Sequence, residues 1–174
     1  MMRLLRRYRG WIMLLLVLGI AGLLFGLAYF QPQKLFLNER RNDPPPVVGV
    51  TGLAGTAQTR AADRILLSGQ LRSLEHRSSG RVVLIALADD SRILRFEQLE
   101  TSNGPDLHVY LSAVPASSSW YGYDRDFVDL GSLKGNEGNQ NYLVPASVDL
   151  SRYGTAVIWC KRFSIGFAVA SLAA

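Results

Sequence analysis

The chain has 174 residues, enough for one domain of ordinary size and some accessory segments. Its net charge is +5, but this excess lies entirely before residue 60, because the 12 basic and 12 acidic residues from Arg60 onward cancel. The part expected to fold therefore has no basic excess for neutralising phosphates, which excludes nucleic-acid binding as an interpretation. The single cysteine, Cys160, excludes an intramolecular disulfide and a paired-cysteine zinc site.

The first predicted element is a transmembrane helix over residues 11–30. This stretch contains no charged residue, and about 20 residues at roughly 1.5 Å each match the thickness of a bilayer core. Trp11 at one end and Tyr29 with Phe30 at the other suit the two interfacial belts, and Pro32 ends the helix. A cleaved signal peptide is the alternative, but its apolar region is usually shorter. We therefore predict an anchor in the lipid bilayer.

The basic residues around this helix predict its orientation. Four arginines lie within residues 1–10, whereas Lys34, Arg40 and Arg41 follow the helix at a greater distance. Basic residues are retained on the cytoplasmic side. We therefore expect a single-pass protein of the cell membrane, with residues 1–10 cytoplasmic and the C-terminal domain extracytoplasmic.

Residues 31–60 are predicted to be a tether between the membrane and the domain. Pro44, Pro45 and Pro46 form a stiff extended piece. Residues 49–59 are mostly small, so we expect little regular structure in this segment.

Residues 61–174 are predicted to form one mostly β domain. The apolar pattern is short and strand-like, without a long stretch of helical period, and turn signals such as those at 77–80 and 103–106 separate the segments. This spacing is typical of an antiparallel β-sandwich or a barrel-like domain. The expected strands are 65–74, 81–88, 92–96, 107–112, 127–130, 142–144, 155–160 and 163–170.

Three segments of the domain resemble one known family. They are FEQLETSNGPDLHVYLS (96–112), VDLGSLKGNEGNQNYLVP (128–145) and VDLSRYGTAVIWCKRFSIGFAVASL (148–172). Together they closely resemble the electron-transfer DM-thirteen domain, a small extracytoplasmic family related to the DOMON domains. The resemblance runs in order over about residues 66–172, and it implies a β-sandwich-like fold with a redox role.

The resemblance also implies that Cys160 is the functional residue, either as a bare thiol or as a ligand to a haem-like cofactor. A functional thiol needs exposure and nearby positive charge, and Arg162 is expected to share the face of Cys160 and to lower its pKa. The alternative is a packing role, because free cysteines are among the most buried residues.

His76 and His108 are the only histidines, so any imidazole ligand to a cofactor must be one of them. Each could pair with Cys160 as an axial ligand of one haem, and each could equally be a surface or hydrogen-bonded histidine. No Cys-x-x-Cys-His motif is present, which excludes covalent c-type haem attachment. No catalytic triad or acid pair points to hydrolysis.

A non-catalytic binding or adhesion module is the alternative function. Trp120, Tyr121 and Tyr123 lie in an irregular aromatic-rich segment that we expect to be exposed. Aromatic side chains are enriched among the residues that dominate protein interfaces. The partner, whether a redox protein or another ligand, is not specified by the sequence.

Overall fold

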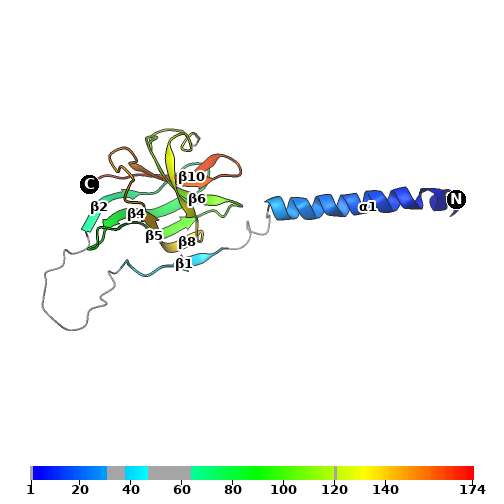
Figure 1. Cartoon of the computed structure of the whole chain (residues 1–174), viewed down its shortest axis with the longest axis horizontal. Helices are drawn as coiled ribbons and strands as arrows, with labels where there is room; N and C mark the ends of the chain where they lie inside the picture. Colours follow the sequence, from blue (N-terminus) through cyan, green and yellow to red (C-terminus); the bar gives the residue numbers. More distant parts are fainter. Residues whose placement is uncertain (1, 31–37, 47–63, 120) are drawn as a thin grey trace.

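The computed structural model describes residues 2–30, 38–46, 64–119 and 121–174, with side chains from Tyr8 onward. One helix is followed by ten strands in these residues, and the strands gather into one domain beside the end of the helix (Figure 1). The elements are α1 (Met2–Phe30), β1 (Arg40–Asn42), β2 (Arg64–Gln70), β3 (Arg72–Ser73), β4 (Ser78–Ala86), β5 (Arg92–Thr101), β6 (Leu107–Ser112), β7 (Phe127–Ser132), β8 (Glu137–Val144), β9 (Thr155–Cys160) and β10 (Ile165–Ser171).

The strands form two five-stranded sheets. Sheet A has the order β1-β8-β5-β4-β2, and sheet B has the order β3-β10-β9-β6-β7. All neighbouring strands are antiparallel except β1 and β8, which are parallel. The predicted mostly β fold is confirmed, and among the described strands the two sheets stay separate and do not close into a barrel.

The core lies between the two sheets, as the alternation within the strands predicts. In β6, Leu107, Val109 and Leu111 point into this core, where they meet Val82 and Leu84 of β4 in one cluster of buried residues. Successive side chains in a strand point to opposite faces. One apolar residue in two therefore suffices to fill the interior.

The outer face of sheet B is also covered. Tyr110 and Trp159 form a second buried cluster there together with Tyr123, which lies in the loop 113–126. This loop folds back over the sheet, and the hydroxyl of Ser112 donates a hydrogen bond to the Tyr123 carbonyl at 2.9 Å. Strand β9 is therefore buried on both faces, which explains why its sequence is apolar at every position except Thr155.

Strand β1 lies inside the segment that the sequence predicted to be an irregular tether. It pairs with the start of β8, where the Glu39 amide donates to Asn136 Oδ1 at 2.7 Å. Farther on, Arg95 Nη1 donates to the Pro44 carbonyl at 3.2 Å. An edge strand such as β8 presents unpaired backbone groups, and β1 satisfies them. The remaining parts of the predicted tether, 31–37 and 47–60, lie outside the described residues.

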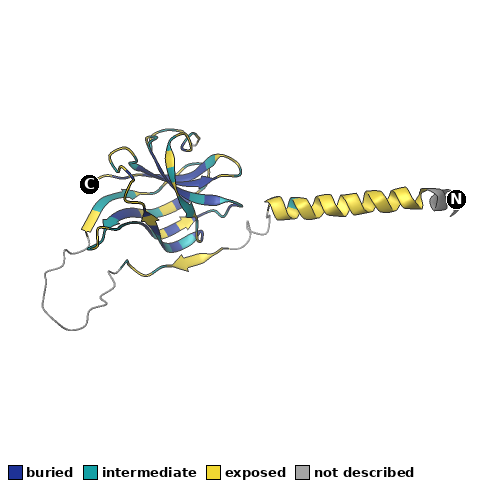
Figure 2. Cartoon of the chain, viewed as in Figure 1, coloured by how far each residue is buried: buried dark blue, intermediate teal, exposed yellow. Residues whose placement is uncertain are grey.

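Helix α1 extends away from the domain, and nearly all of its described residues from Tyr8 onward are exposed (Figure 2). Within the described residues, Tyr8–Phe30 is long and apolar enough to cross a membrane, with a mean hydropathy of 2.6 and no buried share. A helix that is apolar on every face needs an apolar environment. The helix is thus a candidate membrane span, as the sequence predicted.

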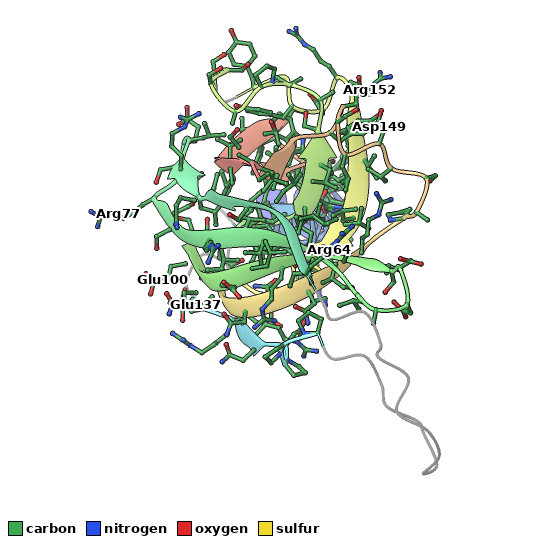
Figure 3. All side chains as sticks on the ribbon, turned by 90° about the vertical axis from the view of Figure 1, so that its left-hand side faces the viewer. Arg64, Arg77, Glu100, Glu137, Asp149 and Arg152 are labelled. Carbon is green, nitrogen blue, oxygen red and sulfur yellow. The ribbon has the colours of Figure 1, made fainter. Side chains whose placement is uncertain are left out.

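The domain surface carries charges of both signs. Seen from the side away from α1, Arg77, Glu100 and Glu137 lie along one flank, and Asp149 and Arg152 lie toward another (Figure 3). Many of these groups are paired, as Arg152 Nη2 is with Asp126 Oδ2 at 2.6 Å. The mixed charges on the surface agree with the equal numbers of basic and acidic residues in this part of the sequence.

Candidate functional site

Cys160 is the last residue of β9, two residues before Arg162, which lies over the ring of Tyr29 near the end of α1. Its backbone neighbours across the sheet are Leu107 of β6 and Ile165 of β10. Ala156, Ile158 and Cys160 share the inward face of β9 and belong to the core between the sheets. The thiol is 0% exposed and unpaired with any other cysteine.

Arg162 does not take the place beside Cys160 that the sequence predicted for it. Strand β9 ends at Cys160 and residues 161–164 form a turn, so the alternation of faces stops there. The Arg162 guanidinium instead lies over the ring of Tyr29, with 4.4 Å between its Cζ and the ring centroid. No hydrogen bond or ion pair links it to Cys160 among the described residues.

His76 packs against β10, the strand that pairs with β9, and no contact between His76 and Cys160 is present among the described residues. Its ring stacks on Phe167 of β10, with 3.8 Å between the ring centroids. Burial lowers the pKa of His76, and the nearby Glu75 carboxylate opposes this effect only partly. The exposed side of His76 lines an open groove of about 760 Å³ with Ser78 and other polar residues.

His108 is held by acidic residues on the outer face of sheet B. Its Nδ1 lies 3.0 Å from both carboxylate oxygens of Asp129, and its Nε2 lies 3.4 Å from Asp106 Oδ1. Lys161 Nζ is 3.4 Å from the same Asp129. Burial opposes ionisation of Asp129, but the hydrogen bonds from His108 and from the Gly131 amide outweigh it, so the pKa of Asp129 lies below its usual value. The sequence did not predict this cluster, since no spacing rule joins residues of separate strands.

The residues present do not fit a haem held between Cys160 and a histidine. Cys160 and Leu107 point into the core, whereas His108 follows Leu107 in the strand and therefore points to the opposite face of sheet B. His76 is separated from the core by the Phe167 ring that stacks on it. Within the described residues, no three His, Cys, Asp or Glu side chains gather as a metal site would require.

An aromatic stack begins at Trp159, the residue before Cys160. The Trp159 and Tyr110 rings are 6.3 Å apart, and Tyr110 stacks on Phe127 at 4.2 Å. Burial raises the pKa of Tyr110 above its ordinary value, and the nearby Asp129 carboxylate adds to the effect. Phe127 is 36% exposed, so the stack leads from β9 to the protein surface. The sequence did not indicate this arrangement, because the three rings come from three strands.

The predicted cluster of exposed aromatic residues is only partly present. Tyr123 was expected to be exposed but is completely buried, because its ring packs edge-on against Trp159 at 6.5 Å. Its hydroxyl donates to the carbonyl oxygen of Ser118 at 3.1 Å. Tyr121 is 52% exposed, as predicted, and Trp120 lies outside the described residues.

Together, the fold and this site define a β-sandwich domain with one protected thiol and an adjoining aromatic stack, connected to an apolar helix. A family model described as Electron transfer DM13 matches residues 70–172, which is more than half of the chain and includes Cys160, His76 and His108. The chain belongs to this family. No match was found among curated proteins or among solved structures.

Proposed function

We propose that this protein is a membrane-anchored electron-transfer protein whose domain lies outside the cytoplasm, with Cys160 as its redox group. The observation that carries the proposal is the family match over the whole of sheet B and most of sheet A, which includes this cysteine. Helix α1 supports the membrane anchor by its length and composition. The four arginines that precede residue 11 support the orientation.

The burial of Cys160 limits how it can exchange electrons. Thiol–disulfide exchange needs attack by a thiolate on an accessible sulfur, and the Cys160 thiol has no exposed surface. Exchange through direct contact therefore requires the end of the domain to open. The stack of Trp159, Tyr110 and Phe127 supports a second route, in which an oxidised redox partner at the protein surface takes one electron from the covered thiol. The thiol then becomes a thiyl radical, and its proton passes to water that enters when the domain opens locally.

Voltammetry of the purified full chain in nanodiscs tests the proposal. We expect a redox signal that disappears in Cys160→Ala and persists in Ile158→Val, a matched variant that alters the same inward face of β9 without removing sulfur. A native absorption spectrum with and without dithionite accompanies this experiment. A signal that is unchanged in Cys160→Ala, or absent from the unmodified protein, would contradict the role of Cys160.

A second candidate function is a binding module, favoured by the exposed ring of Tyr121 in the loop between β6 and β7. Large exposed aromatic side chains are typical anchors in protein interfaces. If this function is correct, Tyr121→Ala abolishes the cellular phenotype of the protein while Cys160→Ala leaves it intact. The electron-transfer function predicts the reverse pattern.

A further inference from the structure

The turn that follows Cys160, residues 161–164, lies against the end of helix α1. The Arg162 guanidinium covers the ring of Tyr29, one residue before the helix ends at Phe30. Tyrosine side chains at the ends of membrane spans lie at the level of the lipid headgroups. A cation stacked on such a ring within 4.4 Å therefore lies at the same level.

The exposed side chains of this turn have the composition of a lipid-contacting surface. Phe163 is 51% exposed and follows Arg162 directly. The Lys161 side chain is 46% exposed and is paired with Asp129. Arg162 is only partly exposed, and its buried Nη1 has no hydrogen-bond partner among the described residues. An apolar ring beside cations suits the interface, where the ring enters the headgroup region and the cation meets phosphates.

The chain between α1 and the domain is too short to let this turn move far from the membrane. Seven residues, 31–37, separate Phe30 from Asn38, so at full extension the two ends are at most about 28 Å apart. Asn38 is already attached to the domain, because Asn136 Nδ2 donates to its Oδ1 at 3.0 Å. Strand β1 then pairs with β8, so the tether does not continue beyond this point.

We propose that the 161–164 turn docks on the phospholipid headgroups beside α1, so that the Cys160 end of the domain faces the membrane surface. The proposal rests on α1 spanning a bilayer, which is part of the proposed function. The recognised chemistry is a phosphate-bearing headgroup next to acyl chains, which Arg162 and Phe163 contact respectively. A partner that approaches Cys160 from this side is consequently a membrane-embedded or lipid-soluble molecule.

Quenching by spin-labelled lipids tests this orientation in the full chain. The protein is reconstituted into vesicles of phosphatidylcholine and phosphatidylglycerol that contain a lipid with a nitroxide on its headgroup. A fluorophore is attached at Ser164→Cys in the turn, or at Ser147→Cys beyond the far end of β8, in a Cys160→Ala background. Both serines are exposed, so the two sites differ mainly in their position relative to α1.

We expect the label at residue 164 to be quenched several-fold more strongly than the label at residue 147. Adding Arg162→Gln and Phe163→Ser should reduce this difference, because both lipid contacts are removed. Equal quenching at the two sites, in protein that resists extraction by alkaline carbonate, would overturn the docking and leave the anchor intact. Extraction by carbonate would instead contradict the membrane span, and with it the docking.

Hydroxyl-radical footprinting provides a test without any substitution. Phe163 and Tyr121 have nearly equal exposed fractions, 51% and 52%. In nanodiscs we expect Phe163 to be oxidised several-fold more slowly than Tyr121, after each rate is divided by that of the free amino acid. Equal normalised rates would overturn the proposal, since lipid would then leave Phe163 uncovered.

Discussion

At the scale of single residues, Cys160 combines a reactive group with complete burial. Its inward position follows from the alternation in β9, which also points Ala156 and Ile158 into the core. The neighbouring Trp159 points outward and is covered by Tyr110 and Tyr123. Reagents can therefore reach the thiol only when the surrounding strands open, and the rate at which Cys160 reacts measures how often they open.

Thiol labelling measures this protection. We expect Cys160 to react with a soluble disulfide reagent only as fast as the domain opens, because the reagent cannot reach a fully buried sulfur. An exposed thiol introduced by Ser147→Cys should react at once and provides the control. Immediate reaction of Cys160 in the folded unmodified protein would show that its burial is not maintained in solution.

Protonation of His76 makes the stability of the folded domain depend on pH. Because burial lowers the pKa of His76 in the folded state, the unfolded chain binds its proton more readily. The stabilisation from the neutral ring is therefore complete above about pH 6.5 and is lost as the pH falls below that value. We expect the urea midpoint to fall between about pH 7.5 and pH 5.5, and to fall less in His76→Gln. An equal decrease in both proteins would contradict this assignment.

At the scale of elements, strand β1 depends on a glycine that allows close approach of two backbones. Gly138 has φ +96°, and a Cβ at this position would overlap the Arg41 carbonyl and lie 2.7 Å from Asn42 Oδ1. Gly131 has a similar φ of +113° with open space around it. A substitution at Gly131 therefore introduces backbone strain without steric overlap. Comparing alanine substitutions at Gly131 and Gly138 therefore shows how much the pairing of β1 contributes to the stability of the domain.

We expect Gly131→Ala to lower the free energy of unfolding by about 1–2 kcal/mol, through the unfavourable positive φ alone. Gly138→Ala should lower the free energy of unfolding by more than this, because it also displaces β1 from β8. Chemical denaturation gives the two values, and trypsin should cut at Arg40 or Arg41 faster in Gly138→Ala. Equal losses and equal cleavage would mean that β1 does not depend on this close approach.

Asp43 attaches the end of β1 to the rest of sheet A. Its Oδ2 accepts hydrogen bonds from Lys134 Nζ at 2.8 Å and from the Asn141 amide at 3.1 Å. Burial opposes the charge, but these hydrogen bonds and one from Arg41 outweigh it and hold the pKa of Asp43 well below its usual value. The ionised carboxylate therefore stabilises the folded state above the ordinary aspartate pKa, and this stabilisation is lost on acidification.

We expect Asp43→Asn to lower the free energy of unfolding by about 2 kcal/mol, as is typical when hydrogen bonds to a charged group are weakened. Asp90→Asn is the matched control, because Asp90 is an exposed turn residue with φ +65°, which asparagine tolerates equally well. Denaturation at neutral pH compares the two variants. A loss in Asp43→Asn no larger than in Asp90→Asn would show that the Asp43 contacts contribute little.

At the scale of the whole molecule, the proposed function requires the two ends of the chain to lie on opposite sides of a membrane. Labelling of intact cells with a membrane-impermeant maleimide tests this arrangement in a Cys160→Ala background. We expect Ser147→Cys to be labelled in intact cells and Met2→Cys only after the cells are permeabilised. The opposite pattern would place the domain in the cytoplasm, and labelling of both positions in intact cells would contradict a single span.

Much of the architecture could be predicted because it depends on neighbours along the chain. The apolar run of α1 and the alternation of Leu107, Val109 and Leu111 are local patterns, and each has only a few structural solutions. The family resemblance likewise placed Cys160 at the end of a strand. The candidate site was predicted less well, since its accessibility depends on what packs around it.

Tertiary packing decided the remaining features, which join residues far apart in the sequence. The Glu39–Asn136 hydrogen bond spans 97 positions, and the His108–Asp129 contact joins two strands that lie side by side only in the folded sheet. The burial of Tyr123 depends in the same way on where its loop packs. The sequence alone determined which segments are apolar and which are extended, because those properties follow from each residue and its near neighbours. Which of these segments meet was determined by the fold, because that choice depends on filling one shared core.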